Sequence, residues 1–379
     1  MTPSLVLVGF SLFAWGIGEG MFLYFVPLYL EQLGADPITI GSVFGAFGLA
    51  MMVAHIPAGY LSDRIGRRPM IWAAWIIGLV ATWGMGLAPS LPLFIVGYVL
   101  YGVTGFVSSP LFSYVTAARG KLTAGRAMTL ASAMYNLGAV LGPVSGGWVG
   151  ERFDIRTIFL VSGAIFVVST GLVFSLKPQP RDTHEGDGSG RNLLTNTRFL
   201  SFLGVSFFVM FAMYLPQPLS PNFLQNERGI TLSQMGLIGS LGSLGNVAFN
   251  LALGYLDTSL GFVLGQVCVA LFALSLWKGT GQPWYMLGYF LLGGFRAARM
   301  LAMAQVRVLI HQAQMGLAYG ITEAGNSAAL ILAPLLAGYL YERDPVSVYP
   351  LGLLLIAIGV IISLVFASRE KRQIVKEIV

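Results

Sequence analysis

Apolar residues along this chain come in long runs, and short polar stretches separate the runs. Each run holds about 20 residues or more, the length of a helix that crosses the hydrocarbon core of a bilayer. We distinguish twelve runs, and they predict twelve membrane-spanning helices. The predicted spans cover residues 5–30, 38–62, 69–88, 91–118, 124–149, 155–177, 198–225, 231–256, 260–278, 283–309, 316–341 and 346–368.

One polar stretch, residues 178–197, is longer than the others and divides the spans into two sets of six. It reads PQPRDTHEGDGSGRNLLTNT and is rich in Gly and Pro, as linkers are. We therefore predict an N-terminal six-helix bundle over residues 1–177. A C-terminal six-helix bundle with a short tail follows over residues 198–379. The fold class is that of an all-α membrane protein.

The second set of spans repeats the plan of the first. Under a shift of 195 residues, Gly34, Gly41, Gly59, Tyr60, Leu61 and Gly66 fall on Gly229, Gly236, Gly254, Tyr255, Leu256 and Gly261. Under a shift of 191 residues, Gly97, Tyr98, Gly102, Gly125, Pro143, Gly147, Glu151 and Arg152 fall on Gly288, Tyr289, Gly293, Gly316, Pro334, Gly338, Glu342 and Arg343. Matches in the same order at two steady shifts predict two pseudo-symmetric bundles.

The composition agrees with a chain that lies mostly in lipid. Of 379 residues, 56% are hydrophobic and 10% are charged, against about 25% charged in a soluble domain, so a soluble fold is excluded. The 48 glycines favour close packing between membrane helices. A single cysteine, Cys268, excludes an intrachain disulfide, and no Cys/His cluster indicates a metal site. We expect no cofactor.

The basic residues predict the orientation of the chain in the membrane. With an even number of spans, fifteen Lys and Arg lie on the side of the two termini and five on the other side. This bias predicts that both termini and the linker are cytoplasmic in a multi-pass protein of the cell membrane, the inner or plasma membrane. It also accounts for the net charge of +6 without a nucleic-acid partner. We expect a monomer surrounded by lipid.

The loop after the second predicted span carries a dense motif, GYLSDRIGRRP. It resembles the signature loop of the major facilitator superfamily, whose twelve-span plan covers the entire chain. The matching residues include Gly59, Asp63, Arg64, Gly66, Arg67 and Arg68. The resemblance implies a conformational latch that holds the two halves in the outward-open state, with Asp63 facing the eleventh helix. The alternative is a topology signal alone.

The fifth predicted span carries a second motif, GAVLGPVSGG. It resembles the motif of superfamily exporters that exchange a substrate for protons, and its matching residues are Gly138, Gly142, Pro143, Gly146 and Gly147. Glycines four apart allow close helix contact, and a proline bends the helix. Plain packing is the alternative. Such exporters often carry an arginine in the fourth span where this chain has Tyr98, so proton coupling through that arginine is excluded.

Four charged residues lie well inside predicted spans, away from the span ends, namely Glu19, Arg296, Arg299 and Glu323. A charge at the bilayer centre costs about 2.5–3.5 kcal/mol on insertion scales, which makes each one a candidate for binding substrate or protons. Arg296 and Arg299 lie on one helix face and require an internal acid or an anionic substrate. Static ion pairs are the alternative, with Glu323 as the nearest acid.

Polar and aromatic residues in the spans are further candidates. Asn136, Gln217 and Asn326 are expected either to line a polar cavity or to join helices by hydrogen bonds. Six aromatic residues of the first and seventh spans are expected either to form an apolar cage for a substrate or to pack against lipid. They are Trp15, Phe22, Tyr24, Phe207, Phe211 and Tyr214.

Taken with the resemblance, these features predict a secondary transporter that moves a small organic molecule by alternating access. The fifth-span motif favours a proton-coupled exporter. The alternatives are a symporter or uniporter for uptake of an organic anion or sugar, which the two arginines would suit, and a membrane receptor that transports nothing. No GxxxxGK[ST], HExxH or GxSxG motif is present, so we expect neither ATP coupling nor an enzyme.

Overall fold

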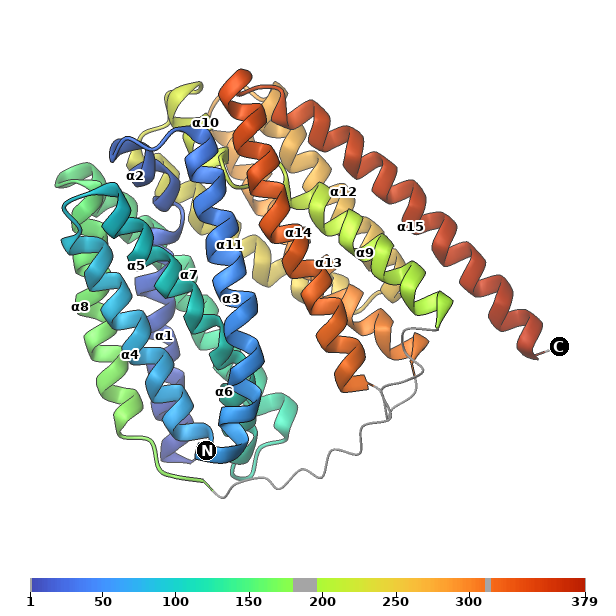
Figure 1. Ribbon diagram of the computed structural model, residues 1–379, viewed down its shortest axis with the longest axis horizontal. Coiled ribbons are helices and arrows are strands. Elements are labelled where there is room, and N and C mark those ends of the chain that lie inside the picture. Colours follow the sequence, from blue (N-terminus) through green and yellow to red (C-terminus); the bar gives the residue numbers. More distant parts are fainter. Residues whose placement is uncertain (1, 180–195, 311–314, 379) are drawn as a thin grey trace. The chain divides into compact units, whose positions relative to one another are not determined.

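The computed structural model describes residues 2–179, 196–310 and 315–378 (Figure 1). The described residues form helices and short connections, with no strand, and the all-α prediction is confirmed. The first helices are α1 (Pro3–Leu23), α2 (Val26–Gln32), α3 (Pro37–Ile65), α4 (Arg67–Leu87), α5 (Leu91–Val103), the 3-10 turn η1 (Thr104–Val107), α6 (Ser108–Ala117), α7 (Ala124–Arg152) and α8 (Ile155–Phe174). The later helices are α9 (Thr197–Tyr214), α10 (Ser220–Asn226), α11 (Leu232–Gly254), α12 (Thr258–Lys278), α13 (Gln282–Leu309), α14 (Met315–Arg343) and α15 (Val348–Ile378).

Eleven stretches among the described residues are helical, long and apolar enough to cross a membrane. The tenth predicted span is the exception. It forms the 28-residue helix α13, but Arg296 and Arg299 lower its apolarity. The helix α13 is therefore present where the sequence predicts the tenth span. It carries two charges that a lipid-exposed span would not carry.

Three predicted spans are interrupted in the structure. The first divides into α1 and α2, and the seventh divides into α9 and α10. Because α2 begins at Val26 and α10 begins at Ser220, the two breaks fall at nearly equivalent places under the shift of 195 residues. The fourth span is interrupted by the 3-10 turn η1, whereas its repeat counterpart α13 is continuous. The repeat thus extends to backbone detail, but only in part.

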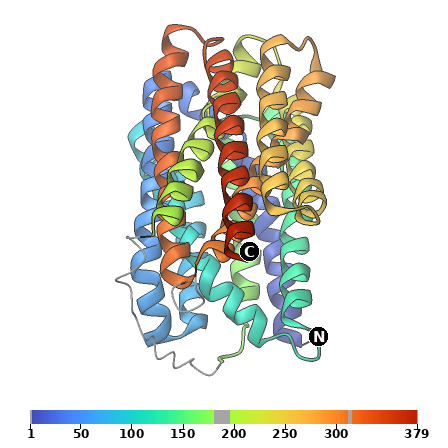
Figure 2. The same cartoon turned by 90° about the vertical axis from the view of Figure 1, so that its right-hand side faces the viewer.

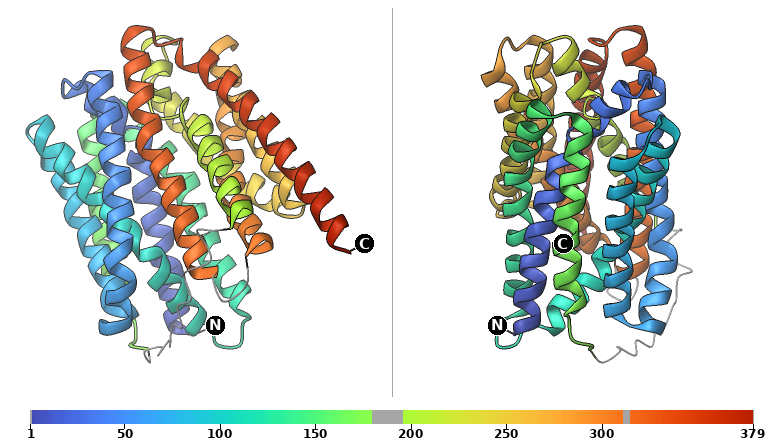
Figure 3. Two further views of the ribbon diagram at one scale, coloured as in Figure 1. Left: turned by 45° about the vertical axis from the view of Figure 1, so that its right-hand side comes forward. Right: turned by 90° about the vertical axis from the view of Figure 1, so that its left-hand side faces the viewer.

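The helices group into two compact units. The first unit holds α1 to α8 together with residues 221–240, which include α10 from its second residue and the beginning of α11. Within it α1 packs against α7 and α8, and α4 packs against α5 and α8 (Figure 3). In the second unit, α9 lies between α14 and α15 (Figure 2), and α12 packs against α13 and α15.

The contact between α1 and α7 depends on glycine. A methyl group added at Gly138, Gly142 or Gly146 of α7 would overlap the backbone of α1. Gly16 of α1 meets the backbone of α7 in the same way. The glycines therefore bring the two backbones into direct contact, as small residues do between membrane helices. This contact fixes the register of the side chains that the two helices present to a neighbouring cavity.

Candidate functional site

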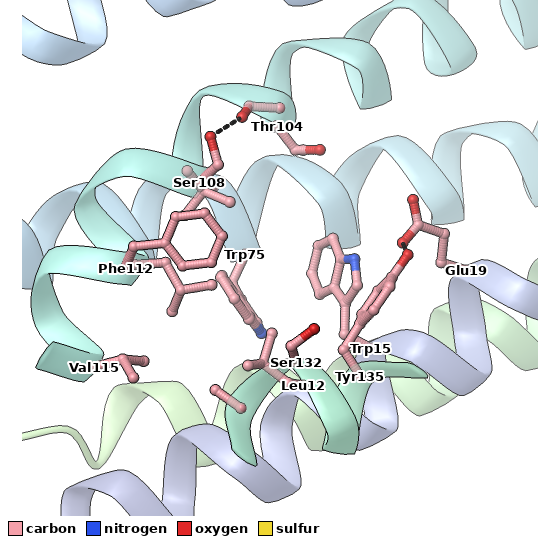
Figure 4. Close-up of a pocket in the computed structure, with 15 residues that line it drawn as sticks. Leu12, Trp15, Glu19, Trp75, Thr104, Ser108, Phe112, Val115, Ser132 and Tyr135 are labelled. Atoms are coloured by element: carbon pink, nitrogen blue, oxygen red, sulfur yellow. Dashed lines mark hydrogen bonds between the residues drawn. The ribbon is translucent and has the colours of Figure 1, made fainter. Parts of the chain in front are cut away.

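A cavity of about 350 Å³ lies inside the first unit (Figure 4). Its walls come from α1, α4, the η1–α6 segment and α7. Among the lining residues, Glu19 of α1 is the one that carries a formal charge at neutral pH, and none is basic. The cavity therefore offers an organic ligand a mostly apolar surface with a single carboxylate.

Glu19 is held by a tyrosine from the neighbouring helix. The hydroxyl of Tyr135 on α7 donates a hydrogen bond of 2.7 Å to Glu19 Oε2 (Figure 4). Tyr101 of α5 is a second neighbour, and its buried hydroxyl is electrostatically coupled to Glu19. The Glu19 carboxylate therefore lies beside two phenols, and the Tyr135 hydroxyl donates a charge-assisted hydrogen bond to it.

Aromatic side chains form the wall beside Glu19. Trp15, one turn before Glu19, stacks on Phe166 at 4.2 Å between ring centroids and lies 4.8 Å from Trp75 of α4. The indole nitrogen of Trp75 donates to the hydroxyls of Ser11 and Ser169, at 2.9 and 2.8 Å. The Trp75 ring is therefore fixed by packing and by hydrogen bonds, and the wall is rigid before a ligand arrives.

The opposite wall is formed by η1 and α6 and carries small polar groups. Thr104 and Ser108 donate to carbonyls of their own segment, at 2.7 Å to Tyr101 and 3.3 Å to Gly105. Because these hydroxyls are satisfied locally, they add polarity without a charge. Phe112 of α6 also lines the cavity (Figure 4) and is 48% exposed, so one aromatic ring of this wall is open to a ligand.

The other candidate charges belong to the second unit. Arg299 of α13 forms an ion pair with Glu323 of α14. Tyr214 of α9 lies within electrostatic reach of Arg299 and stacks on Phe295 at 5.7 Å between centroids. Arg296 is exposed on the surface of its helix. Arg299 is therefore paired with an internal acid, whereas the Arg296 side chain is exposed.

The three predicted polar residues do not join Glu19. The amide of Asn136 donates to Ser132 of its own helix at 2.8 Å. The amide of Gln217 likewise donates to the carbonyl of Met213 at 2.7 Å. Asn326 is fully buried and accepts a hydrogen bond of 3.0 Å from the hydroxyl of Ser206, which joins α14 to α9. None of the three lines the cavity around Glu19.

The predicted latch is only partly described. The chain reverses between α3 and α4 through one residue, Gly66, whose φ of 90° favours glycine. Arg64 is exposed, Arg67 bonds the Gln179 side chain at 3.3 Å, and Arg68 lies over the Trp72 ring at 4.1 Å. The side-chain surroundings of Gly59 and Asp63 lie outside the described residues, so the latch remains a prediction.

The fifth-span motif has two packing faces. Its first face, Gly138, Gly142 and Gly146, meets α1. Its second face, Gly147 with the carbonyl of Pro143, meets Gly236 of α11 within the first unit. The motif therefore joins the helix that carries Glu19 to the beginning of the eighth predicted span, whatever its relation to proton exchange.

Sequence reasoning missed most of the cavity wall. Tyr135, Trp75, Ser108 and Ser132 line it, and none was a candidate. One signal was present, because Tyr135 lies three residues before Gly138 and thus on the same face of α7 as the glycine motif. Trp75 and Ser108 carried no comparable signal, since an aromatic ring or a serine in a membrane helix is usually a packing residue.

Comparison with known proteins places the chain in a large group of transporters. Its sequence matches the profile of the Major Facilitator Superfamily over residues 8–216 and 202–377. The quinolone resistance protein NorA of Staphylococcus aureus is 23% identical over 369 residues, which are 90% of this chain and 91% of that protein. The multi-drug resistance efflux pump PmrA of Streptococcus pneumoniae is 30% identical over 176 residues, which are 44% of this chain.

Other relatives and solved structures agree on the fold. The match to PmrA covers 43% of that protein. A match to an uncharacterized transporter of Methanocaldococcus jannaschii is 26% identical and covers 44% of that protein. This chain therefore spans less than half the length of these two relatives. A mutant of the nucleoside transporter NupG is similar with a TM-score of 0.83, at 14% identity and 96% coverage of this chain and 99% of the other. A bacterial homologue of the lysosomal transporter Spinster, solved in an inward-facing and occupied conformation, reaches a TM-score of 0.70 at 13% identity, with 96% and 94% covered.

Proposed function

Because the chain belongs to the major facilitator superfamily, whose members carry small molecules across membranes, we propose that it is an exporter of amphipathic organic cations driven by exchange for protons. The cavity around Glu19 is the substrate site. The cytoplasmic placement of both termini and the monomeric state belong to the same proposal. Nothing in the proposal requires a cofactor or an enzymatic step.

The cavity supports this proposal by its chemistry. Its volume of about 350 Å³ lies within the range of about 300–1,000 Å³ typical of small-molecule sites. Trp15, Trp75 and Phe112 line it, and Phe112, which is 48% exposed, offers an aromatic face that attracts both flat apolar molecules and cations. The Glu19 carboxylate supplies a counter-charge, and the absence of a basic group among the lining residues disfavours an anion.

Proton exchange follows from competition at one carboxylate. Charged Glu19 attracts a cation, whereas protonated Glu19 is neutral and releases it. A site that opens alternately to an acidic outside and a less acidic cytoplasm therefore binds protons on the outside and substrate on the inside. The Tyr135 bond favours the charged form and thus the binding of substrate.

The relatives support the direction of transport. Two of them are described as a quinolone resistance protein and a multi-drug resistance efflux pump. The glycine motif of α7, which resembles that of proton-exchanging exporters, packs against the helix that carries Glu19. Sequence resemblance and position of the motif therefore favour export.

Uptake of an organic anion is the second candidate, and Arg296 is the observation in its favour. This side chain is exposed on α13, where a carboxylate or phosphate can reach it. Its neighbour Arg299 is already paired with Glu323, so an anion would compete with an internal acid there. The arginine pair is thus half neutralised, and the acidic cavity remains the better site.

Everted membrane vesicles separate the two candidates. With an imposed pH gradient, acidic inside, the vesicles accumulate ethidium, a flat organic cation, and do not accumulate carboxyfluorescein, an organic anion. The E19Q variant loses ethidium accumulation by about tenfold or more, because a neutral amide neither attracts the cation nor exchanges a proton. The E342Q variant, which removes an exposed acid at the end of α14, retains it.

The outcomes distinguish the hypotheses. Accumulation of ethidium that survives E19Q would remove Glu19 from the mechanism. Accumulation of the anion, with loss in the R296Q variant, would favour the second candidate. Accumulation of ethidium that persists after the pH gradient is collapsed with nigericin would exclude proton exchange.

A further inference from the structure

A second cavity lies at the end of the first unit that holds the N-terminus, and we call it the arginine pocket. Its volume is about 410 Å³. The hydroxyl of Thr2 donates to the carbonyl of Ala118 at 2.5 Å, which places the N-terminus beside the end of α6. The pocket is lined by the first residue of α4, by one side of α6 and by a residue that follows α6. These lining residues are Arg67, Phe112, Ser113, Thr116, Ala117 and Arg119.

The arginine pocket is basic and rich in hydrogen-bond donors. Arg67 and Arg119 supply two guanidinium groups, and the described residues that line the pocket include no acid. Ser113 and Thr116 add two hydroxyls, and neither side chain forms a hydrogen bond with another described residue. A guanidinium group presents a planar fork of N–H donors that fits two oxygens of a phosphate group. The pocket therefore favours an anion with several acceptor oxygens.

Hydrogen bonds to neutral groups hold the two guanidinium groups beside α6. The side-chain oxygen of Gln179 accepts from Arg67 Nη1 at 3.3 Å, while its amide nitrogen donates to the carbonyl of Tyr114 at 3.0 Å. Arg119 Nη1 donates to the carbonyl of Thr116 at 3.0 Å. Both arginines are thus positioned before a ligand arrives, which lowers the conformational entropy that binding must remove.

The second repeat shows that the fold does not require these two arginines. Under the shift of 195 residues Arg67 corresponds to Phe262, and under the shift of 191 residues Arg119 corresponds to Ile310. Phe262 and Ile310 are 3% and 8% exposed, so apolar side chains are packed where the first unit carries charges. A signal for membrane orientation needs arginines on one side of the membrane but does not need them to share a cavity. A ligand therefore explains the arginine pair better than folding or topology does.

An apolar surface adjoins the two arginines. Phe112 and Ala117 line the pocket and are exposed, so a ligand that fills the pocket brings apolar atoms beside its anionic group. Phe112 also lines the cavity around Glu19, and the two spaces thus share this side chain. They differ in charge, since one contains a carboxylate and the other contains two guanidinium groups. The two spaces therefore suit ligands of opposite charge.

We propose that the arginine pocket binds the phosphate group of an amphipathic anion. Arg67 and Arg119 contact the phosphate oxygens, and the apolar part of the ligand lies against Phe112. The hydroxyls of Ser113 and Thr116 donate to the same phosphate. Such a phosphate belongs either to an anionic phospholipid of the membrane or to a soluble organic phosphate. The site is separate from the cavity around Glu19 and does not depend on the cargo of the transporter.

Binding to the purified full-length protein in an uncharged detergent tests the proposal. Native mass spectrometry measures the binding of dioleoyl phosphatidic acid, and the control ligand is dioleoylglycerol, the same molecule without its phosphate. Phenyl phosphate, a soluble ester, is tested by the rise in unfolding temperature that a ligand of the native state causes. A phosphate ligand should bind, and dioleoylglycerol should not. The R67Q/R119Q variant should bind the phosphate ligand about tenfold more weakly, because it loses charge-assisted hydrogen bonds.

Three further variants make the test specific. The R126Q variant removes a positive charge from an exposed position of α7 that does not line the pocket, so it should bind like the parent. The R119Q variant changes one exposed residue and should weaken binding severalfold, which covers the case in which R67Q/R119Q does not fold. The E19Q variant should bind like the parent, because Glu19 lines the other cavity.

Each outcome decides for or against the pocket. Binding of phosphatidic acid alone, with loss in the two arginine variants, supports the proposal and identifies a membrane lipid as the source of the phosphate. Binding of phenyl phosphate with the same loss supports it and identifies a soluble source.

The proposal is overturned if the parent binds neither phosphate ligand, or if dioleoylglycerol binds as tightly as phosphatidic acid. It is also overturned if R119Q and R67Q/R119Q bind like the parent, or if R126Q or E19Q weakens binding as much as R119Q does. Because none of these measurements involves the transport of ethidium, failure of this proposal leaves the proposed function untouched, and the converse also holds.

Discussion

The cavity of the first unit and the charged cluster of the second unit occupy equivalent positions of the two repeats. Under the shift of 191 residues, Ser108 corresponds to Arg299 and Ser132 corresponds to Glu323. In the first unit these are small side chains that line an open space. In the second unit they are long charged side chains that form an ion pair. The equivalent positions therefore line an open space in the first repeat and carry a partly exposed ion pair in the second.

The acidic residue of each repeat lies at a different position of the repeat, because Glu19 and Glu323 are not equivalent under either shift. Glu19 of the first unit corresponds to Tyr214 under the shift of 195 residues, and Tyr135 corresponds to Asn326 under the shift of 191. In the first unit the carboxylate lines the cavity and accepts a hydrogen bond from a phenol. In the second unit the carboxylate of Glu323 is engaged by Arg299. Under the proposed function, the first repeat binds substrate, while in the second repeat the charges join α13 to α14.

Transfer of the ion pair into the first unit tests this comparison most severely. The S108R/S132E double variant should place two long charged side chains in the cavity at the positions equivalent to Arg299 and Glu323, and ethidium transport in vesicles should fall about a hundredfold or more. Thermal unfolding in detergent shows whether the protein still folds. The S108A/S132A variant is the control and should transport, because the Ser108 hydroxyl bonds within its own segment. Retained transport in S108R/S132E would mean that the cavity is not the substrate site.

Removal of one partner of the native ion pair has the next largest effect. The E323Q variant leaves Arg299 without its counter-charge and should lower the free energy of unfolding by about 1–3 kcal/mol. This loss is smaller than the loss expected when one partner of a fully buried ion pair is removed. The side chains are 22% and 38% exposed, which supports this discount. The R299Q/E323Q double variant should recover most of the loss in thermal unfolding. A double variant as unstable as E323Q would show that the pair is not the source of the stability.

The sequence predicted the fold well because the bilayer imposes few choices. A span must satisfy its own backbone hydrogen bonds, so runs of apolar residues identify helices almost by themselves. The family profile and the similar structures confirm the prediction of a superfamily fold. The interruptions were not predicted, because Pro27 and Pro216 were read as parts of continuous spans. The predicted contact of Asp63 with the eleventh helix lies outside the described residues.

The site was less predictable than the fold. Glu19 and Arg299 were candidates because a charge in a span is costly, and this argument needs no structure. Trp75 and Tyr135 were not candidates, since their roles depend on which helices touch. Contact between α1 and α7 follows from the glycine motif, but the facing side chains depend on register, which the spacing of glycines alone does not fix.

Loss of the phenol that holds Glu19 should have a moderate effect on transport. The Y135F variant keeps the ring and removes the hydrogen bond of 2.7 Å to the carboxylate. This bond holds the carboxylate in place for a cation, so its loss should lower ethidium transport in vesicles about fivefold. The Y114F variant, which loses a bond to the Lys177 carbonyl outside the cavity, should leave transport unchanged. Undiminished transport in Y135F would separate Tyr135 from the binding of substrate.

The smallest expected effect concerns a helix cap that differs between the repeats. Asp36 caps α3, where Thr39 N donates to its carboxylate at 2.7 Å, and its counterpart Thr231 caps α11 by accepting from Gln234 N at 3.3 Å. Hydrogen bonds from the Thr39 side chain and backbone lower the pKa of Asp36. Because this pKa is lowered, the cap stabilises the fold at pH values above the pKa of Asp36 in the unfolded chain, about 3.9. This contribution is lost as the pH falls through the pKa of Asp36 in the folded protein.

The D36N variant should thus unfold about one to two degrees lower than the parent at pH 7 and at nearly the same temperature at pH 3. The T231D variant should gain an acid-sensitive cap, because a carboxylate at this position of α11 accepts from the same N–H. If the D36N difference were the same at both pH values, the hydrogen bonds from Thr39 would not depend on the charge of the carboxyl, and the two caps would be equivalent in function as well as in position.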